Sequence, residues 1–156
     1  MNFIVAKTRE QIAFCKDVLF AFRTNLDETT YIDLVMEMIA NQAFKLVYIP
    51  NENNTKAVGF IGYRTMHMLM TGWTIYVDDL YTDPGYRGKG YAGALLDHVD
   101  QKATAAGIQF VHLDSGYMLH DAHRLYLNKG YVLACNHFAK GSFLKNNPNG
   151  KESLPR

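Results

Sequence analysis

The chain has few of the residues from which disulfide frameworks and metal sites are built. Its 156 residues include two cysteines, Cys15 and Cys135, and each lies in an apolar stretch. Two reduced thiols in a core are therefore expected, with no disulfide and no metal site. The six histidines show no ligand spacing with these cysteines. We expect the protein to work without a metal.

The sequence also lacks charge blocks and long apolar runs. Its formal net charge is +1, and basic and acidic residues are spread along the chain. This distribution argues against a nucleic-acid-binding face or a polybasic membrane patch. No apolar run approaches a membrane-spanning length, and the N-terminus lacks the parts of a secretion signal. We expect a cytoplasmic protein with no nucleic-acid or membrane partner, and a homodimer stays open.

The sequence contains the alternating periodicities of one folded domain. At this length we predict a single domain over residues 1–143 and a flexible tail over residues 144–156. Residues 8–22 begin with a capping box, in which Thr8 and Gln11 cap a helix. A long antiparallel ribbon is expected over residues 57–81 and a closing strand over residues 131–138. The order βααβββαβαβ predicts an α+β fold, with a mixed, mostly antiparallel central sheet flanked by about four helices.

A glycine-rich turn, YRGKGYAG at residues 86–93, joins a predicted strand to a predicted helix. Such a turn offers unpaired N–H groups to an anion at the positive end of the helix dipole. A nucleoside triphosphatase is improbable, because Tyr91 and Ala92 stand where that loop needs Lys and Ser or Thr. Gly88, Gly90 and Gly93 also spell G-x-G-x-x-G. Dinucleotide binding stays an alternative, although residues 82–87 separate the strand from the first glycine, which that fingerprint places directly after the strand.

The region from Ala57 to Phe138 resembles the GNAT superfamily of acetyl-CoA-dependent N-acetyltransferases. Residues 87–92, RGKGYA, match every fixed position of that family's (Q/R)-x-x-G-x-(G/A) pattern. The pattern follows VDDLYTDPGY and precedes HDAHRLYLNKGY, which is similar to the family's next motif. The resemblance implies a GNAT-like fold with acetyl-CoA as cosubstrate. It also implies transfer of the acetyl group to a primary amine, by direct attack in a ternary complex. The form of the second motif favours a small-molecule amine.

The resemblance also implies a set of cofactor-binding residues. Backbone N–H groups of the glycine turn would hold the CoA pyrophosphate, and the end of the preceding strand would pair with the pantetheine arm as an added strand. Basic side chains of the turn and of the later helix would add positive charge. The cofactor-binding set is Leu80, Tyr81, Thr82, Arg87, Gly88, Lys89, Gly90, Tyr91, Ala92, Gly93, Arg124 and Lys129.

Attack on a thioester needs a proton acceptor for the amine, a donor to the oxyanion and an acid for the departing thiolate. Tyr126 is the candidate acid, because it occupies the family's Leu-Tyr position; a core aromatic is the alternative. Asp79, followed by Asp78, is the candidate base, and a structural ion pair is the alternative for either. Strand alternation places Asp79 with Ile75 and Val77, and a bulge would exchange the faces. The oxyanion donor is expected from backbone N–H near Leu80.

The acceptor pocket is expected between the second helix, the ribbon and the closing strand. Many of its candidate residues are also compatible with plain packing. An acyl-CoA-binding sensor or regulatory module without turnover is the alternative from another functional class, and retention of Tyr126 with both aspartates favours an enzyme. The candidates for substrate contact are Leu26, Tyr31, Tyr63, His67 and Tyr76, with Asp78.

Overall fold

The computed structural model describes residues 1–140 and divides the chain into two compact units, Met1–Leu113 and Asp114–Arg156. The predicted domain end at residue 143 and the tail at residues 144–156 lie outside the described residues, and the single domain stays a prediction. The first unit contains β1 (Ile4–Val5), α1 (Arg9–Phe14), α2 (Lys16–Phe22), α3 (Tyr31–Asn41), β2 (Phe44–Pro50), β3 (Ala57–Met68), β4 (Gly72–Thr82), the short 3₁₀ helix η1 (Pro84–Tyr86), α4 (Tyr91–Ala105) and β5 (Phe110–Leu113). The second unit contains α5 (His120–Asn128).

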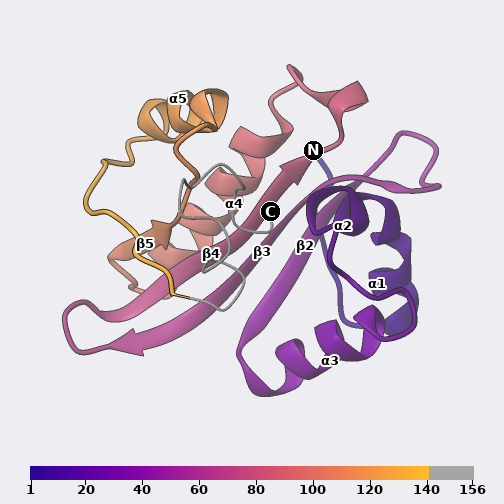
Figure 1. The fold of residues 1–156 in the computed structure, drawn as a ribbon, viewed down its shortest axis with the longest axis horizontal. Coiled ribbons are helices and arrows are strands. Elements are labelled where there is room, and N and C mark those ends of the chain that lie inside the picture. Colours follow the sequence, from indigo (N-terminus) through magenta and orange to yellow (C-terminus); the bar gives the residue numbers. More distant parts are fainter. Residues whose placement is uncertain (141–156) are drawn as a thin grey trace. The chain divides into compact units, whose positions relative to one another are not determined.

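The first unit is built around a five-stranded sheet with the order β1-β2-β3-β4-β5 (Figure 1). Neighbouring strands are antiparallel except β4 and β5, which run parallel after the crossover through α4. β3 and β4 form the long ribbon expected from the sequence, with a short turn between Met68 and Gly72. The predicted α+β class and the mixed, mostly antiparallel sheet are confirmed.

Helices α1 to α3 and the sheet enclose the main core. Phe22 at the end of α2 packs on Phe60 of β3 and Tyr81 of β4, with ring centroids 6.0 and 5.5 Å apart. Ile12 and Cys15 are fully buried in the same cluster. Leu95, Leu96 and Val99 are the fully buried residues of α4, which packs against β3 and β4. Burial of aliphatic side chains in this way is the main source of the unit's stability.

The first predicted helix is present as two helices. The capping box is confirmed, because Thr8 Oγ1 accepts a hydrogen bond from the Gln11 N–H while Gln11 Oε1 accepts one from the Thr8 N–H. The helix then breaks at Cys15, whose N–H bonds to Ile12 O in a tight turn. The apolar spacing of residues 12–22 continues across the break at Cys15. This spacing therefore predicts one continuous helix and does not reveal the break.

The closing strand expected at residues 131–138 is wrong for this structure. Residues 131–140 form no strand, and the side chains of Val132, Leu133 and Phe138 are 79, 89 and 91% exposed. Apolar content makes a segment suitable for a sheet, but a strand forms only where another strand supplies hydrogen-bond partners. No strand of the described residues pairs with this segment.

Candidate functional site

The glycine turn leads directly into α4, as expected, and two of its residues adopt left-handed backbone. Gly88 has φ +74° and Gly90, the N-cap of α4, has φ +80°. A residue with a side chain is disfavoured at these positions because its Cβ would approach its own backbone carbonyl in the left-handed conformation. Crowding by neighbours is not the cause, since a Cβ at either position would meet nothing within 4 Å. Glycine is therefore required for the path of the chain at this turn.

The N–H groups of residues 88–93, called the cradle below, are the backbone donors of the turn and of the start of α4. Among the described residues none of them donates a hydrogen bond, and the first helical bond of α4 runs from the Ala94 N–H to Gly90 O. The amides at the start of a helix are left without intrahelical partners, and they lie at the positive end of the helix dipole. Consecutive free amides on a glycine turn are the arrangement of donors that suits a diphosphate.

The end of β4 leaves one of its edges open. β5 pairs with β4 only from Thr74 to Val77, so residues 78–82 have β3 on one side and no strand of the described residues on the other. The Asp83 N–H donates to Val58 O, which makes Gly59 and Thr82 a pair without mutual hydrogen bonds. In an antiparallel pair the N–H and C=O groups of successive residues point alternately toward the partner strand and away from it. The N–H and C=O groups of Thr82 and Leu80 therefore point away from β3, to the open edge. An extended ligand can bond there as an added strand.

A bulge in β4 places the two candidate carboxylates. Gly62 pairs with Asp79 and Tyr63 pairs with Val77, so Asp78 is the extra residue of β4. Asp79 contacts Arg23 from the end of α2, and Asp78 contacts Arg64 of β3, which faces the same side as Gly62. The expected grouping of Asp79 with Ile75 and Val77 on one face is therefore wrong. The bulge turns both carboxylates toward the helices α1 to α3.

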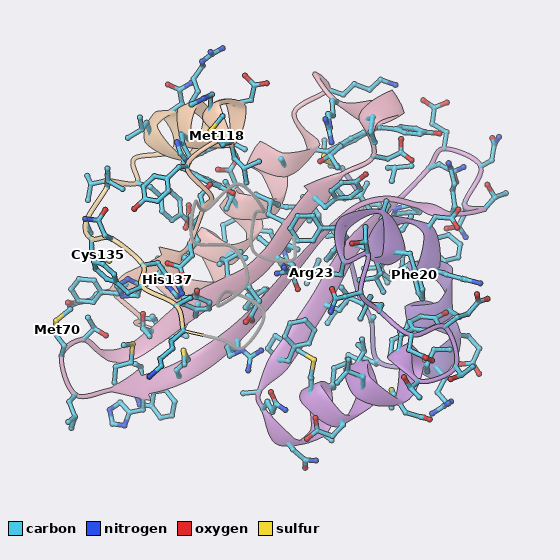
Figure 2. All side chains as sticks on the ribbon, viewed as in Figure 1. Phe20, Arg23, Met70, Met118, Cys135 and His137 are labelled. Atoms are coloured by element: carbon cyan, nitrogen blue, oxygen red, sulfur yellow. The ribbon has the colours of Figure 1, made fainter. Side chains whose placement is uncertain are left out.

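Each carboxylate is held by its own arginine. Arg23 Nε donates to Asp79 Oδ1 at 2.7 Å, its Nη2 also donates to that oxygen, and Nη2 donates to the Asp78 carbonyl at 3.1 Å. Arg64 Nε donates to Asp78 Oδ2 at 2.9 Å, and Arg64 Nη1 donates to Gln42 Oε1 at 3.0 Å. Figure 2 labels Arg23, which lies between the end of α2 and the strands. Two ion pairs thus flank the bulge.

Burial and charge act in opposite directions on Asp79. Burial raises the pKa of this carboxyl above its ordinary value of 3.8, and the Arg23 guanidinium opposes that rise. The close approach at Gly62 contributes to the burial. A Cβ at Gly62 would lie 2.8 Å from the Phe44 ring and 3.1 Å from Asp79 Oδ2. The absence of a side chain at Gly62 leaves this space to the Phe44 ring of β2 and the Asp79 carboxylate of β4.

The basic side chains of the turn lie close to aromatic rings. Arg87 Nε donates to Thr82 O at 3.2 Å, and its guanidinium lies 5.9 Å from the centre of the Tyr81 ring. Lys89 Nζ lies 5.1 Å from the centre of the Tyr86 ring. Both cations stay beside the cradle and add to its positive potential, while the backbone amides supply the directed hydrogen bonds.

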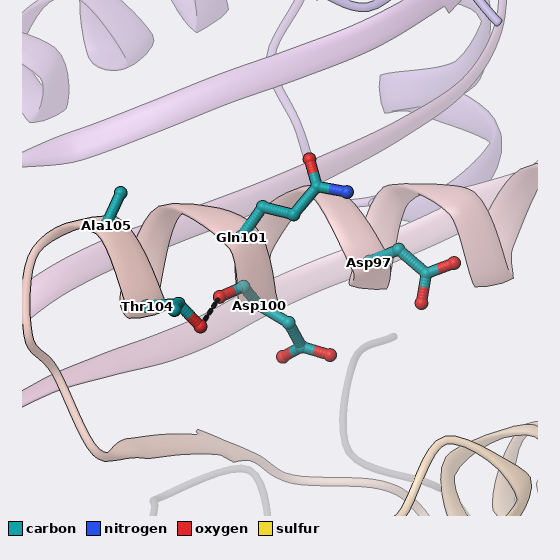
Figure 3. Close-up of a pocket in the computed structure, with 5 residues that line it drawn as sticks. All are labelled: Asp97, Asp100, Gln101, Thr104 and Ala105. Carbon is teal, nitrogen blue, oxygen red and sulfur yellow. Dashed lines mark hydrogen bonds between the residues drawn. The ribbon is translucent and has the colours of Figure 1, made fainter.

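Two hollows lie near α4 and its turn. The larger one, of about 480 Å³, lies on the outer side of α4 and is lined by Asp97, Asp100, Gln101, Thr104 and Ala105 (Figure 3). Its two carboxylates make it a poor site for a polyanion. The other, of about 350 Å³, borders the glycine turn and is lined by Asn51, Glu52, Asn53, Gly85, Tyr86 and Lys89. The cosubstrate hypothesis fits the second location better.

The structure separates the residues expected to contact the acceptor. Tyr76 pairs with Arg64 across the ribbon, next to the bulge. Tyr63 is buried on the opposite face, and His67 stacks on Trp73 near the ribbon tip with 4.7 Å between ring centroids. Tyr31 is buried against Phe20, and Leu26 packs at the border of the core. Tyr76 and Asp78 are thus together at the bulge, and a substrate role for any of the six stays a prediction.

The second unit carries the candidate acid and the later basic residues. Tyr126 lies on α5, its ring centroid is 6.0 Å from that of Tyr131, and burial raises the pKa of its hydroxyl. A raised pKa keeps the phenol protonated, as an acid must be before it acts. Arg124 is exposed and lies 3.9 Å from Asp121, and Lys129 is the C-cap of α5. Their catalytic and cofactor-binding roles stay predictions.

Sequence reasoning missed both arginines. Arg23 lies 56 residues from Asp79 along the chain, at the C-cap of α2, and nothing local in the sequence links the two. Arg64 lies two residues after Gly62 on the same face of β3, and its contact with Asp78 crosses to the neighbouring strand. The one available signal was a pair of adjacent aspartates in an otherwise apolar strand, because such carboxylates need cationic partners.

The described part of the chain contains no candidate for a metal site or a membrane-spanning helix. Within residues 1–140, no group of three or more His, Cys, Asp or Glu side chains is arranged to hold a metal ion. No helix of that part is both long enough and apolar enough to cross a membrane.

The glycine cradle, the open edge of β4 and the order of elements can be compared with known proteins. The model of the acetyltransferase (GNAT) family matches residues 13–131. An uncharacterized N-acetyltransferase of Bacillus subtilis (strain 168), YhdJ, is 30% identical over 134 residues, which cover 85% of this chain and 93% of that protein. The chain therefore belongs to the GNAT acetyltransferase family. It is an acyltransferase of the N-acetyltransferase type, and this family generally uses acetyl-CoA.

Solved structures with the same fold act on different acceptors according to their names. A ribosomal-protein-alanine N-acetyltransferase from Brucella melitensis biovar Abortus 2308 superposes with a TM-score of 0.74 at 17% identity, over 90% of this chain and 99% of that one. An aminoglycoside acetyltransferase from an uncultured soil metagenomic sample, in complex with trehalose, superposes with a TM-score of 0.74 at 15% identity. The superposition covers 90% of this chain and 95% of that one. At these identities the likeness establishes the fold alone.

Proposed function

We propose that this enzyme transfers an acetyl group from acetyl-CoA to a primary amine of a small molecule. The observation that carries the proposal is the continuity of two binding elements in one stretch of chain. The open edge of β4, with the backbone groups of Leu80 and Thr82, leads within a few residues to the free amides of residues 88–93. A molecule with an amide-containing arm and a diphosphate matches both elements.

The residues of the cradle and those of the end of β4 bind different parts of the cosubstrate. The N–H groups from Gly88 to Gly93 hold the diphosphate, and Arg87 and Lys89 raise the local positive potential. Tyr81 supports Arg87, and Leu80 and Thr82 bond to the extended arm. Arg124 and Lys129 of α5 are proposed to contact the ribose phosphate.

The chain's own groups then handle charge and protons during direct attack in a ternary complex. Acetyl-CoA supplies the acetyl group and a thiolate leaving group. The Leu80 N–H faces the open edge and donates to the thioester oxygen as negative charge develops there. Asp79 or Asp78 accepts the proton that the amine loses as its nitrogen bonds to the carbonyl carbon. Tyr126 donates its proton to the sulfur as the carbon–sulfur bond breaks.

A small-molecule acceptor is favoured by the surroundings of the bulge. The carboxylates lie between α2, the strands and Phe44, and their side chains are 15 and 21% exposed. A single primary amine on a compact molecule can reach such partly buried groups more easily than a residue within folded protein. Tyr76 beside Asp78 is proposed to contact it. The cytoplasmic location and the absence of nucleic-acid and membrane partners stay predictions.

The test is a screen of amines with purified protein and acetyl-CoA. Polyamines, aminoglycosides, amino acids, aminophosphonates and short peptides are each incubated, and acetylated product is measured by mass spectrometry. We expect at least one small amine to be acetylated, with activity lost in Gly90→Asp and kept in Gly107→Ala. Acetylation of peptides alone would contradict the small-molecule acceptor. Tight binding of acetyl-CoA without any product would favour the sensor module over the enzyme.

A further inference from the structure

Arg23 lies at the bulge of β4 and has no role in the proton transfers of the proposed reaction. Arg23 is the C-cap of α2, and its guanidinium stacks on the Phe22 ring with 4.7 Å to the centroid. Its side chain is 33% exposed, while the carboxylate that it binds is 15% exposed. The partly exposed guanidinium of Arg23 thus lies against the nearly buried carboxylate of Asp79.

We infer that Arg23 is a positioning residue of the acetyl-transfer site, which fixes the bulge of β4 by holding the Asp79 carboxylate and the Asp78 carbonyl in one guanidinium fork. The inference rests on the proposed function, because the bulge precedes the open edge where Leu80 is proposed to act. The guanidinium is planar and carries several donors in fixed directions, so one group bonds both the side chain of Asp79 and the backbone of the residue before it.

The fork has a consequence for geometry. A bulge is a local break in pairing, and its backbone is held by fewer ladder hydrogen bonds than regular strand. The Asp78 carbonyl belongs to the extra residue, and the Arg23 bond at 3.1 Å gives it a partner. Fixing this peptide fixes the direction of the next ones, including the Leu80 N–H. Without the fork, donors at the open edge lose their preorganised aim.

The fork also has a consequence for charge. The charged groups facing Asp79 are Arg23 from α2, Asp78 from its own strand and Arg64 from β3; after the end of α3 the neutral amide of Gln42 contacts Arg64. Arg23 and Arg64 favour the ionised carboxylate, whereas burial and Asp78 disfavour it. Arg23 is the cation in direct contact. Its removal leaves a nearly buried carboxylate without its direct partner, so Asp79 is protonated over a wider pH range.

The test compares Arg23→Met and Arg23→Lys with the wild type. In Arg23→Met we expect kcat/KM relative to wild type to be about tenfold lower at pH 6 than at pH 9, where Asp79 is again ionised. At pH 9 the ratio should rise only to the level of Arg23→Lys, because both variants lack the fork. Taking the ratio at each pH removes the ionisation of the acceptor amine. In Arg23→Lys we expect the wild-type pH profile with lower kcat, because lysine restores the charge without the fork.

A second measurement keeps the inference separate from the proposed function. Carbon-13 NMR of aspartate-labelled protein follows the titration of the Asp79 carboxyl, which is assigned by its loss in Asp79→Asn. We expect the titration to move to higher pH in Arg23→Met but not in Arg9→Met, which breaks an exposed Arg9–Asp33 pair of the same kind. An unchanged titration in Arg23→Met overturns the inference. If the titration moves but no amine is ever acetylated, the proposed function has failed and the electrostatic role of Arg23 stands.

Discussion

Replacing Gly90 separates the backbone requirement of the glycine turn from its charge requirement. Gly90→Ala forces an L-residue into φ +80° where a Cβ meets no neighbour, so its cost is conformational. That cost is roughly 1–2 kcal/mol. For a chain of this size each kcal/mol lowers the Tm by about 2–4 °C. We therefore expect a Tm lower by about 2–8 °C and weaker acetyl-CoA binding, because relaxation of the turn misaligns the amides of the cradle.

Gly90→Asp should lower the Tm less than Gly90→Ala does and weaken acetyl-CoA binding more. Aspartate tolerates left-handed backbone better than alanine and favours the start of a helix, so its loss of stability should be smaller. Its charge, however, lies where the diphosphate binds. Two unit charges about 4 Å apart repel by roughly 1 kcal/mol in water and about 4 kcal/mol near a protein surface. We expect the Kd for acetyl-CoA to rise by at least about fivefold.

Gly107 provides the matched control at the other end of the same helix. It has φ +67°, and a Cβ there also meets nothing within 4 Å. Fifteen residues of α4 put it about 22 Å from the cradle. Gly107→Ala should lower the Tm as Gly90→Ala does and leave the Kd unchanged. Calorimetric Kd and Tm values decide: if Gly90→Asp binds acetyl-CoA as Gly107→Ala does, the cradle does not hold the diphosphate.

Three further outcomes follow from side chains already described. Tyr126→Phe should lower kcat about a hundredfold with little change in the Kd for acetyl-CoA; equal losses in steady-state kinetics and calorimetry would count against the acid role. Gly62→Ala should cost roughly 1–3 kcal/mol in urea unfolding, because its Cβ meets the Phe44 ring; an unchanged midpoint would contradict this crowding. With Ellman's reagent, Cys135 should react at once and Cys15 only on unfolding, since burial raises the pKa of the Cys15 thiol; two fast thiols would refute the burial.

The parts of the fold that the sequence predicted depend on neighbours along the chain. The Thr8 and Gln11 capping box joins residues three apart, and the ribbon of β3 and β4 joins strands separated by a short turn. The glycine turn before α4 is likewise local, so Gly88 and Gly90 could be named with a reason for each. Local steric and hydrogen-bonding preferences decide such features.

The parts that escaped prediction depend on contacts between distant segments. The bulge at Asp78 follows from the register of β4 against β3, opposite Gly62, and strand alternation alone cannot locate it. The Arg23 contact joins residues 56 apart. The strand expected at residues 131–138 failed for a related reason. The apolar pattern is present there, but no strand of the described residues pairs with the segment, and the local sequence does not reveal this.

The open side of β4 carries a risk as well as a function. Unpaired strand edges attract strands of other molecules, and the usual defence is to cover or charge them. Among residues 1–140 the length without a second partner strand is short, from residue 78 to residue 82, and the bulge at Asp78 interrupts its start. If the cosubstrate fills this edge, it also shields it, and ligand binding stabilises the native state by mass action. Purified protein should then keep better in storage with CoA present than without it.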